Sequence, residues 1–175
     1  RTFQNIRLFN KMSVLDNVKV GLHSNIETNL FQSIVHNRQY KVIERETTEK
    51  AMDLLQFFNM EGLANAPAGS LPYGAQRRLE IVRALATDPS IILLDEPAAG
   101  MNPSETAELM DNIRKIRDEF HLAVLLIERD MSLVMNVCEG LAVLNYGKII
   151  AKGTPSQIQD NPAVIEAYLG RRKDK

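Results

Sequence analysis

The chain has 175 residues, of which 45% are hydrophobic and 25% are charged, and its formal net charge is −1. This length suits one domain with a sizeable core, and the near-neutral charge argues against a broadly nucleic-acid-binding surface. The single cysteine, Cys138, excludes an internal disulfide, and no apolar stretch approaches the roughly 20 residues that span a bilayer. Any membrane association is therefore expected to run through a partner.

Residues 10–70 show helical periodicity and no convincing strand, whereas residues 1–9 are expected to be extended. Apolar side chains recur at positions i, i+3, i+4 and i+7, which is the spacing of one helix face. They are Ala51, Leu54, Leu55 and Phe58. The stretch 21–48 is polar, carries charges of both signs and is expected to be mobile.

A helix and a strand are predicted from residue 71 onward. The helix follows Gly74 and carries inward-facing apolar residues at Leu79, Val82, Leu85 and Ala86. In the strand, 91–95, four branched apolar residues run into Asp95 and Glu96. An apolar run of this length predicts a strand that is buried on both faces of a parallel sheet.

The two carboxylates that end this strand are the strongest candidates for chemistry. Open α/β sheets bind their ligands at the carboxyl ends of the strands. One carboxylate of such a pair can hold Mg²⁺, usually through water, and the next can polarise an attacking water. Burying two carboxylates without a metal or a cationic partner would be costly, so Asp95 and Glu96 predict a site for Mg-nucleotide hydrolysis.

The alternation of helices and strands continues to the end of the chain. Asn102 and Glu105 have the spacing of a capping box, with Pro103 at the first helical position, so a helix is predicted to begin there. The further predicted elements are a buried strand at 122–127, a helix at 131–138, two strands within 141–153, and helices at 155–160 and 162–169. This order argues for an α/β fold with a largely parallel sheet.

Three segments resemble the nucleotide-binding subunit of ABC transporters in order and spacing: LPYGAQRRLEIVRAL (71–85), ILLDEPAAGMNP (92–103) and LLIERD (125–130). The resemblance extends from Phe3-Gln4 to Tyr168-Leu169-Gly170, and details such as PAAGMNP look most like the ATPases of branched-chain amino acid importers. It implies the α/β core of a P-loop NTPase-type ABC ATPase, with an incomplete, largely parallel sheet and an α-helical subdomain. The implied divisions are a glutamine-loop segment (1–9), the helical subdomain and signature helix (10–88), and the C-terminal part of the ATPase core (89–175).

The resemblance also implies a role for individual residues. Asp95 corresponds to the carboxylate on the Mg²⁺ side, Glu96 to the general base, and Gln4 to the glutamine that senses Mg²⁺ and the γ-phosphate. The signature loop of the family binds the ATP of the opposite subunit at a helix N-terminus. Its counterparts here are Leu71, Pro72, Tyr73, Gly74 and Gln76. Residues 98–102 resemble the loop that touches the other subunit, and Asn102 is counted among its nucleotide-binding residues.

The chain departs from the family pattern in three ways. Pro72 stands where the signature loop has a serine, and proline supplies neither a hydroxyl nor a backbone N–H. Arg129 stands where the family has a histidine that contacts the γ-phosphate and the catalytic glutamate, and guanidinium can only donate. No Gly-x-x-x-x-Gly-Lys-[Ser/Thr] occurs in the 175 residues, so the chain is expected to begin after the phosphate loop, as a fragment or as a product that has lost its first part.

The resemblance implies an ATP- and Mg²⁺-dependent ATPase subunit of an importer. Its implied partners are a second ATPase subunit, identical or not, transmembrane permease subunits and, indirectly, a periplasmic or extracellular substrate-binding protein. Its implied place is the cytoplasmic face of the plasma membrane, and nucleic acid is not an expected partner. Two alternatives remain: a truncated or degenerate, non-hydrolysing ABC domain that only binds partners, and a soluble ABC ATPase that acts on nucleic acid, against which the charge and the single copy of the motifs argue.

Two further expectations concern structure rather than chemistry. Arg77, Arg78 and Arg83 are expected on a charged outer face of the signature helix. Because an incomplete sheet exposes unpaired strand edges, this chain by itself is expected to be poorly stable or prone to aggregation. Because the phosphate loop is absent, it is also expected not to bind ATP tightly.

Overall fold

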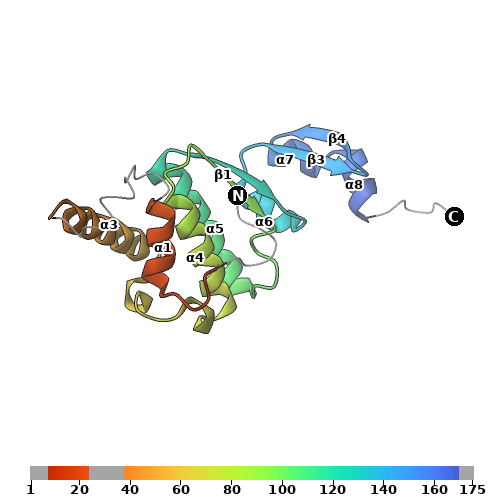
Figure 1. Ribbon diagram of the computed structural model, residues 1–175. Coiled ribbons are helices and arrows are strands. Elements are labelled where there is room, and N and C mark those ends of the chain that lie inside the picture. The colour runs from red at the N-terminus through yellow and green to blue at the C-terminus, as the bar shows by residue number, and fades with distance from the viewer. Residues whose placement is uncertain (1–7, 24–37, 170–175) are drawn as a thin grey trace. The chain divides into compact units, whose positions relative to one another are not determined.

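The computed structural model describes residues 8–23 and 38–169, and its packing divides the chain into two compact units, Arg1–Ile127 and Glu128–Lys175 (Figure 1). Each unit is described by itself below. The division into a glutamine-loop segment, a helical subdomain and an ATPase core stays a prediction. The expected extended segment falls almost entirely on residues 1–7, which lie outside the described residues, as does Gln4.

The first unit begins with helices that pack on one another. Helix α1 (Val14–His23) contacts both α3 (Arg38–Phe57) and α4 (Tyr73–Leu85), as Figure 1 shows, and two short 3₁₀ turns, η1 (Glu61–Leu63) and η2 (Ala68–Ser70), lie between α3 and α4 in sequence. A Cβ added at Gly21 of α1 would lie 2.5 Å from the Arg83 carbonyl oxygen. The crossing of α1 and α4 therefore requires a glycine at this position.

The helical prediction for 10–70 is confirmed for the described residues of this range, with one correction. Residues 38–48 were expected to be part of a mobile polar stretch, but they form the first half of α3. Thr47, Ala51 and Leu55 are buried along one face of α3. A helix needs only one such face to pack, so polar residues elsewhere in 38–48 do not prevent it from forming. Residues 24–37 of the same stretch lie outside the described part of the chain.

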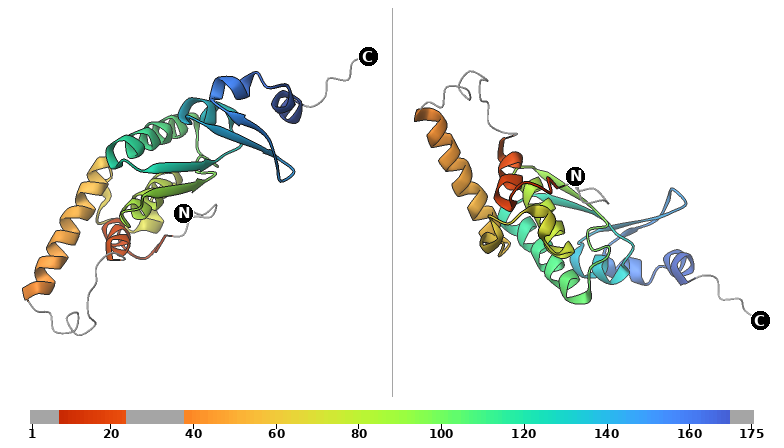
Figure 2. Two further views of the ribbon diagram at one scale, coloured as in Figure 1. Left: turned by 90° about the horizontal axis from the view of Figure 1, so that it is seen from above. Right: turned by 60° about the horizontal axis from the view of Figure 1, so that its bottom comes forward.

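Two parallel strands joined by a helix complete the first unit (Figure 2). Strand β1 (Ile91–Asp95) pairs with β2 (Ala123–Ile127) in the register Ile91↔Ala123 to Asp95↔Ile127, and α5 (Pro103–Phe120) connects them and contacts β2. Asn102 caps α5 through the predicted capping box, and the buried face of the helix carries Leu109, Asn112, Ile113 and Ile116. The predicted strand–helix–strand order is confirmed.

The burial predicted for these strands is wrong on one face. Ile92 and Leu94 are 1% exposed, whereas Ile91, Leu125 and Ile127 are 56%, 53% and 50% exposed. Successive side chains of a strand point to opposite faces, and partners in a parallel pair share a face, so these three residues lie on the same side of the sheet. The two-stranded sheet is therefore covered on one face only, among the residues that the structure describes.

This uncovered face predicts self-association. Replacing Leu125 with lysine should reduce binding of a hydrophobic dye and shift the chain toward the monomer in sedimentation, with little change in stability, because the side chain is half exposed. Leu94→Lys is the matched control, since Leu94 is buried on the opposite face and a charge there should unfold the unit. Unchanged self-association in Leu125→Lys would show that this face is not the adhesive surface.

The second unit is a β-hairpin packed with short helices. Helix α6 (Met131–Val137) precedes β3 (Leu141–Asn145) and β4 (Lys148–Gly153), which pair antiparallel, and α7 (Pro155–Gln159) and α8 (Pro162–Leu169) follow. The hairpin turns at Tyr146 and Gly147, both at positive φ, as a tight two-residue turn of type I′ requires. The small core gathers around Val143, Ile158 and Val164. In the described part of both units, no helix is long and apolar enough to cross a membrane.

Candidate functional site

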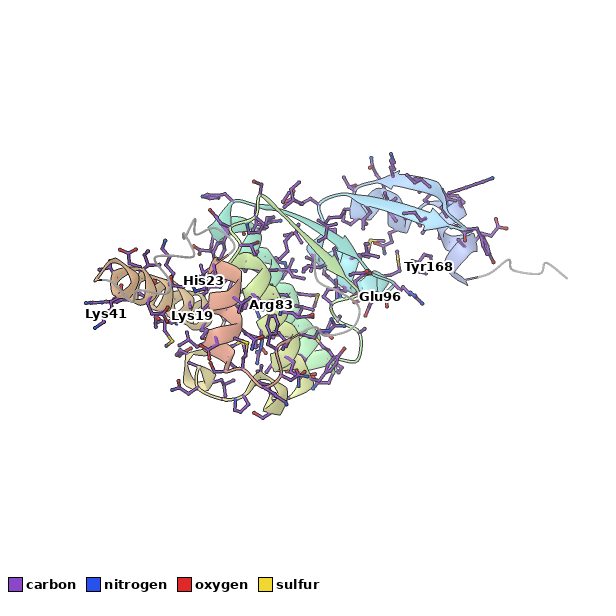
Figure 3. The ribbon with its side chains drawn as sticks, viewed as in Figure 1. Lys19, His23, Lys41, Arg83, Glu96 and Tyr168 are labelled. Atoms are coloured by element: carbon purple, nitrogen blue, oxygen red, sulfur yellow. The ribbon has the colours of Figure 1, made fainter. Side chains whose placement is uncertain are left out.

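The two predicted carboxylates lie where β1 ends (Figure 3, where Glu96 is labelled). Asp95 is the last residue of β1, and the backbone N–H of Glu96 donates to the Ile127 carbonyl at 2.8 Å, which extends the ladder with β2. Both side chains are only partly buried, so neither carries the full desolvation cost of a buried carboxylate. This end of β1 thus presents two adjacent carboxylates that a cation or a polar substrate can reach.

Glu96 has an unusual backbone conformation, with φ at +43°. For a residue with a Cβ, the left-handed region costs about 1–2 kcal/mol. Such conformations persist where the surroundings hold them, and they gather at functional sites. The hydrogen bond to Ile127 is one of the contacts that hold Glu96 in place. Nothing in the sequence around Glu96 signalled this conformation.

The loop after Glu96 is tied both to Glu96 and to the start of α5. The Ala99 N–H donates to the Glu96 carbonyl at 3.2 Å, and Gly100 turns the chain at φ +78°. Asn102 Oδ1 then accepts from the Glu105 N–H at 3.0 Å, while the Asn102 N–H donates to Glu105 Oε2 at 2.9 Å. The Asn102 side chain is therefore engaged in capping α5, and its role at a nucleotide stays a prediction.

The loop 71–76 forms the start of α4. Pro72 is the N-cap residue and makes no side-chain capping bond, while Gln76 Nε2 donates to the Leu71 carbonyl at 2.8 Å. The first-turn N–H groups of a helix have no acceptor within the helix, and together with the helix dipole they favour an anion. Pro72 and Tyr73 are exposed at this end, and Leu71 and Gly74 are buried. The Glu105 carboxylate already lies beside Gly74 at this end of α4, so anion binding by the loop 71–76 stays a prediction.

The arginines of α4 do not share one outer face, which corrects the sequence prediction. Arg77 is 3% exposed, and its Nη1 donates to Glu80 Oε2 at 3.0 Å inside the unit. Arg78 forms an ion pair with Glu108 of α5. The Arg83 guanidinium lies 5.6 Å from the centre of the Phe9 ring. Burial lowers the pKa of Arg83. An acid three residues after Arg77 was the signal that could have indicated a paired, buried arginine.

Tyr73 contributes a contact that the sequence did not indicate. Its hydroxyl accepts from Arg77 Nε at 3.2 Å, and the Arg77 guanidinium lies 5.6 Å from the ring centre. A Cβ added at Gly100 would lie 3.4 Å from Tyr73 Cε1, so the ring covers the turn of the loop that follows Glu96. The start of α4 and the loop after β1 are thereby brought together within the first unit.

The remaining predicted residue, Arg129, belongs to the second unit. Its side chain is exposed, and its N–H donates to Glu128 Oε2 at 3.1 Å just before Asp130 caps α6. Among residues 8–23 and 38–169, no three or more His, Cys, Asp or Glu side chains gather into a metal site. The part of Asp95, Gln4 and Arg129 in binding Mg²⁺ or phosphate stays a prediction.

The parallel β1–β2 pair joined by α5, together with the helices of the first unit, forms part of an α/β domain of the P-loop NTPase fold. A family model described as "ABC transporter" matches residues 1–99, and one described as "Branched-chain amino acid ATP-binding cassette transporter" matches residues 148–174. The chain belongs to the ABC transporter ATP-binding family, as its sequence motifs indicated.

Several relatives and solved structures are similar over nearly the whole chain. The high-affinity branched-chain amino acid transport ATP-binding protein BraF of Pseudomonas aeruginosa is 48% identical over 170 residues, which are 97% of this chain and 67% of that protein. LivG of Escherichia coli, which carries the same description, is 44% identical over the same shares. A crystal structure of an ATP-binding cassette of an ABC transporter in its ADP conformation is 28% identical, with a TM-score of 0.74, and the match covers 97% of this chain and 66% of that one. The chain thus spans about two thirds of these proteins.

Proposed function

We propose that this protein is the ATP-binding and ATP-hydrolysing subunit of an ABC importer, and that it energises the uptake of branched-chain amino acids across a membrane. The observation that carries the proposal is the pair Asp95 and Glu96 at the carboxyl end of β1, with Glu96 held at φ +43°. The similarity to BraF and LivG supports both the activity and the transported class.

The residues divide the chemistry between them. Asp95 offers carboxylate oxygens, the ligand type that Mg²⁺ prefers, at a strand end that solvent reaches. Bound Mg²⁺ would neutralise charge on the phosphates of ATP. Glu96 orients the attacking water and accepts its proton, and the N-terminus of α4 binds the phosphates of an ATP held by a second subunit. Gln4 and Arg129 are assigned to the γ-phosphate side of the site.

The same proposal names the assembly. Two ATPase subunits would pack head to tail, so that each ATP lies between Asp95 and Glu96 of one subunit and the loop 71–76 of the other. Closure of this pair would move the transmembrane permease subunits, which receive the amino acid from a substrate-binding protein on the opposite side. The protein would therefore work on the cytoplasmic face of the membrane.

The experiment that tests this proposal measures ATP hydrolysis and uptake together. The protein in its full native length is assembled with its permease subunits in vesicles that contain ATP, and the substrate-binding protein is supplied outside. Uptake of labelled leucine is then compared with uptake of a sugar. ATP hydrolysis that rises with leucine uptake is the expected result. Hydrolysis without leucine uptake would refute the proposal that branched-chain amino acids are transported. The absence of hydrolysis would refute the proposal that the protein hydrolyses ATP.

A second candidate function is a non-hydrolysing ABC domain that only binds partners. Two departures from the family pattern motivate it. Pro72 makes no side-chain bond at the cap of α4, and Arg129 stands where the family has a histidine, which can accept a proton. If these two residues weaken an active site, Pro72→Ser and Arg129→His should each raise the rate of hydrolysis. One added hydrogen bond to a charged group is worth about 1.5–3 kcal/mol, which corresponds to roughly a tenfold gain or more.

The control for this pair is Ser132→Ala, because Ser132 follows Arg129 closely but its side chain lies exposed on α6. Its rate should stay at the wild-type value. No gain from either Pro72→Ser or Arg129→His in an active wild-type protein would show that these residues do not limit the reaction. No activity in any variant, with ATP binding retained, would favour the non-hydrolysing domain.

A further inference from the structure

We propose that Tyr73 is a positioning residue: it joins the start of α4 to the loop after Glu96, and so links the two ATP sites that each subunit serves. The inference rests on the proposed function, because that function places the loop 71–76 at one ATP and Glu96 at the other. Four contacts within the first unit carry it.

The first contact fixes the position of the Tyr73 ring. Arg77 lies one helical turn after Tyr73, donates to its hydroxyl at 3.2 Å and places its guanidinium 5.6 Å from the ring centre. Both the hydrogen bond and the cation–π contact favour the same ring position. A tyrosine that is 43% exposed would otherwise be able to change rotamer in solvent.

The second contact fixes Arg77 itself. Its side chain and that of Glu80 are 3% and 2% exposed, and their ion pair measures 3.0 Å. A buried ion pair is screened little by solvent and cannot exchange its partners for water without cost. Arg77 is therefore a rigid support for the Tyr73 ring, rather than a mobile surface charge.

The third contact is the one between the ring and Gly100. A Cβ at Gly100 would lie 3.4 Å from Cε1 and 3.8 Å from the hydroxyl of Tyr73. Gly100 is the turn of the loop, at φ +78°, and the preceding residue donates its N–H to the Glu96 carbonyl at 3.2 Å. A displacement of the Tyr73 ring thus reaches Glu96 through one turn of backbone.

The fourth contact is between Gly74, the residue of α4 that follows Tyr73, and Glu105. A Cβ at Gly74 would lie 2.7 Å from Glu105 Oε1, and the other oxygen of that carboxylate accepts from the Asn102 N–H. Tyr73 therefore lies against the turn of the loop, and Gly74 lies against the capping box that ends it. A phosphate that pulls on the loop 71–76 would move the loop 97–102 with it.

The test uses the protein in its full native length within its transporter, with Tyr73→Ala and Tyr73→Phe as variants. Hydrogen exchange without nucleotide reads the loop directly at the amides of Ala99 and Met101, which donate to the Glu96 and Ala98 carbonyls. Tyr73→Ala should speed their exchange by about tenfold, because the loop opens locally more often once the ring no longer covers it. Tyr73→Phe keeps the ring over Gly100 and should stay within about threefold of wild type.

Kinetics separates positioning from direct binding of ATP. If Tyr73 positions Glu96, Tyr73→Ala should lower kcat roughly 10- to 100-fold and leave KM for ATP nearly unchanged. Tyr73→Phe should recover most of kcat. Tyr146→Ala is the control, because Tyr146 is 98% exposed in the β3–β4 turn, and it should change neither kcat nor the exchange of the loop.

The outcomes that would overturn the inference differ from those that would overturn the function. Unchanged exchange at Ala99 and Met101 in Tyr73→Ala would refute the contact whether or not the protein hydrolyses ATP. A raised KM at constant kcat would make Tyr73 an ATP-binding residue and would also refute the inference. A wild-type protein with no hydrolysis would refute the proposed function and, with it, the link between two ATP sites.

Discussion

Replacing Glu96 with glutamine should abolish ATP hydrolysis and leave nucleotide binding in place. The amide has nearly the same shape as the carboxylate, so the backbone at φ +43° and the hydrogen bond from Glu96 N–H to Ile127 can stay as they are. An amide cannot take the proton of the attacking water, and loss of a general base lowers the rate by about 10²- to 10⁴-fold. Steady-state hydrolysis and equilibrium binding of a fluorescent ATP analogue, both measured on the full-length protein, check the two halves of this expectation.

The matched control is Glu119→Gln, which makes the same chemical change at an exposed carboxylate near the end of α5. Its rate and its binding should equal those of the wild type. Hydrolysis that survives in Glu96→Gln would remove Glu96 from the role of base. Loss of binding together with hydrolysis would point instead to a residue that holds the nucleotide or its metal.

The second large effect concerns stability and the ion pair inside the first unit. Glu80→Ala should lower the free energy of unfolding of this unit by about 3–5 kcal/mol, because it removes the carboxylate that is paired with the buried Arg77 guanidinium. Denaturant unfolding followed by far-ultraviolet circular dichroism measures the change. A double variant, Arg77→Met with Glu80→Leu, should recover most of the loss, since apolar side chains of similar size often replace a buried pair without penalty.

An exposed ion pair with the same sequence spacing and the same distance supplies the control. Arg114 and Asp111 of α5 are also three residues apart and also 3.0 Å from one another, but their side chains are 42% and 66% exposed. Asp111→Ala should therefore cost less than about 1 kcal/mol. Equal losses in Glu80→Ala and Asp111→Ala would show that burial does not decide the strength of the Arg77 pair.

Local chemistry explains which parts of the site were predictable. The capping box depends on Asn102 and Glu105, which are three residues apart, and its geometry follows from the backbone between them. The apolar run that ends in Asp95 and Glu96 likewise predicts a strand with two carboxylates at its end. The family motifs are local sequences of the same kind, and their order and spacing along the chain are enough to indicate the ABC family.

Other features of the site arise only between segments that are distant in sequence. Arg77 is buried because α4 packs within the first unit, although a helix with charges at 77, 78 and 83 is typical of a solvent-exposed face. Ile91 and Leu125 are exposed because the face of β1 and β2 on which they lie is left uncovered in the described structure. The apolar runs that contain them nevertheless predict buried strands. Whether a residue is buried depends on which other segments pack against it. The residues that adjoin it in the sequence do not carry this information.

The sequence by itself determined the order of helices and strands, the capped start of α5, and the family to which the chain belongs, because each depends on spacing within a short stretch. The tertiary structure decided the left-handed backbone of Glu96, the burial of Arg77 with Glu80, and the contact of Tyr73 with Gly100. Glu96 is held by Ile127 at the end of β2, Arg77 and Glu80 are buried where α4 packs within the first unit, and Tyr73 lies against Gly100 of the loop 97–102. Long-range packing sets such meetings, and a single strand or helix carries no local signal for them.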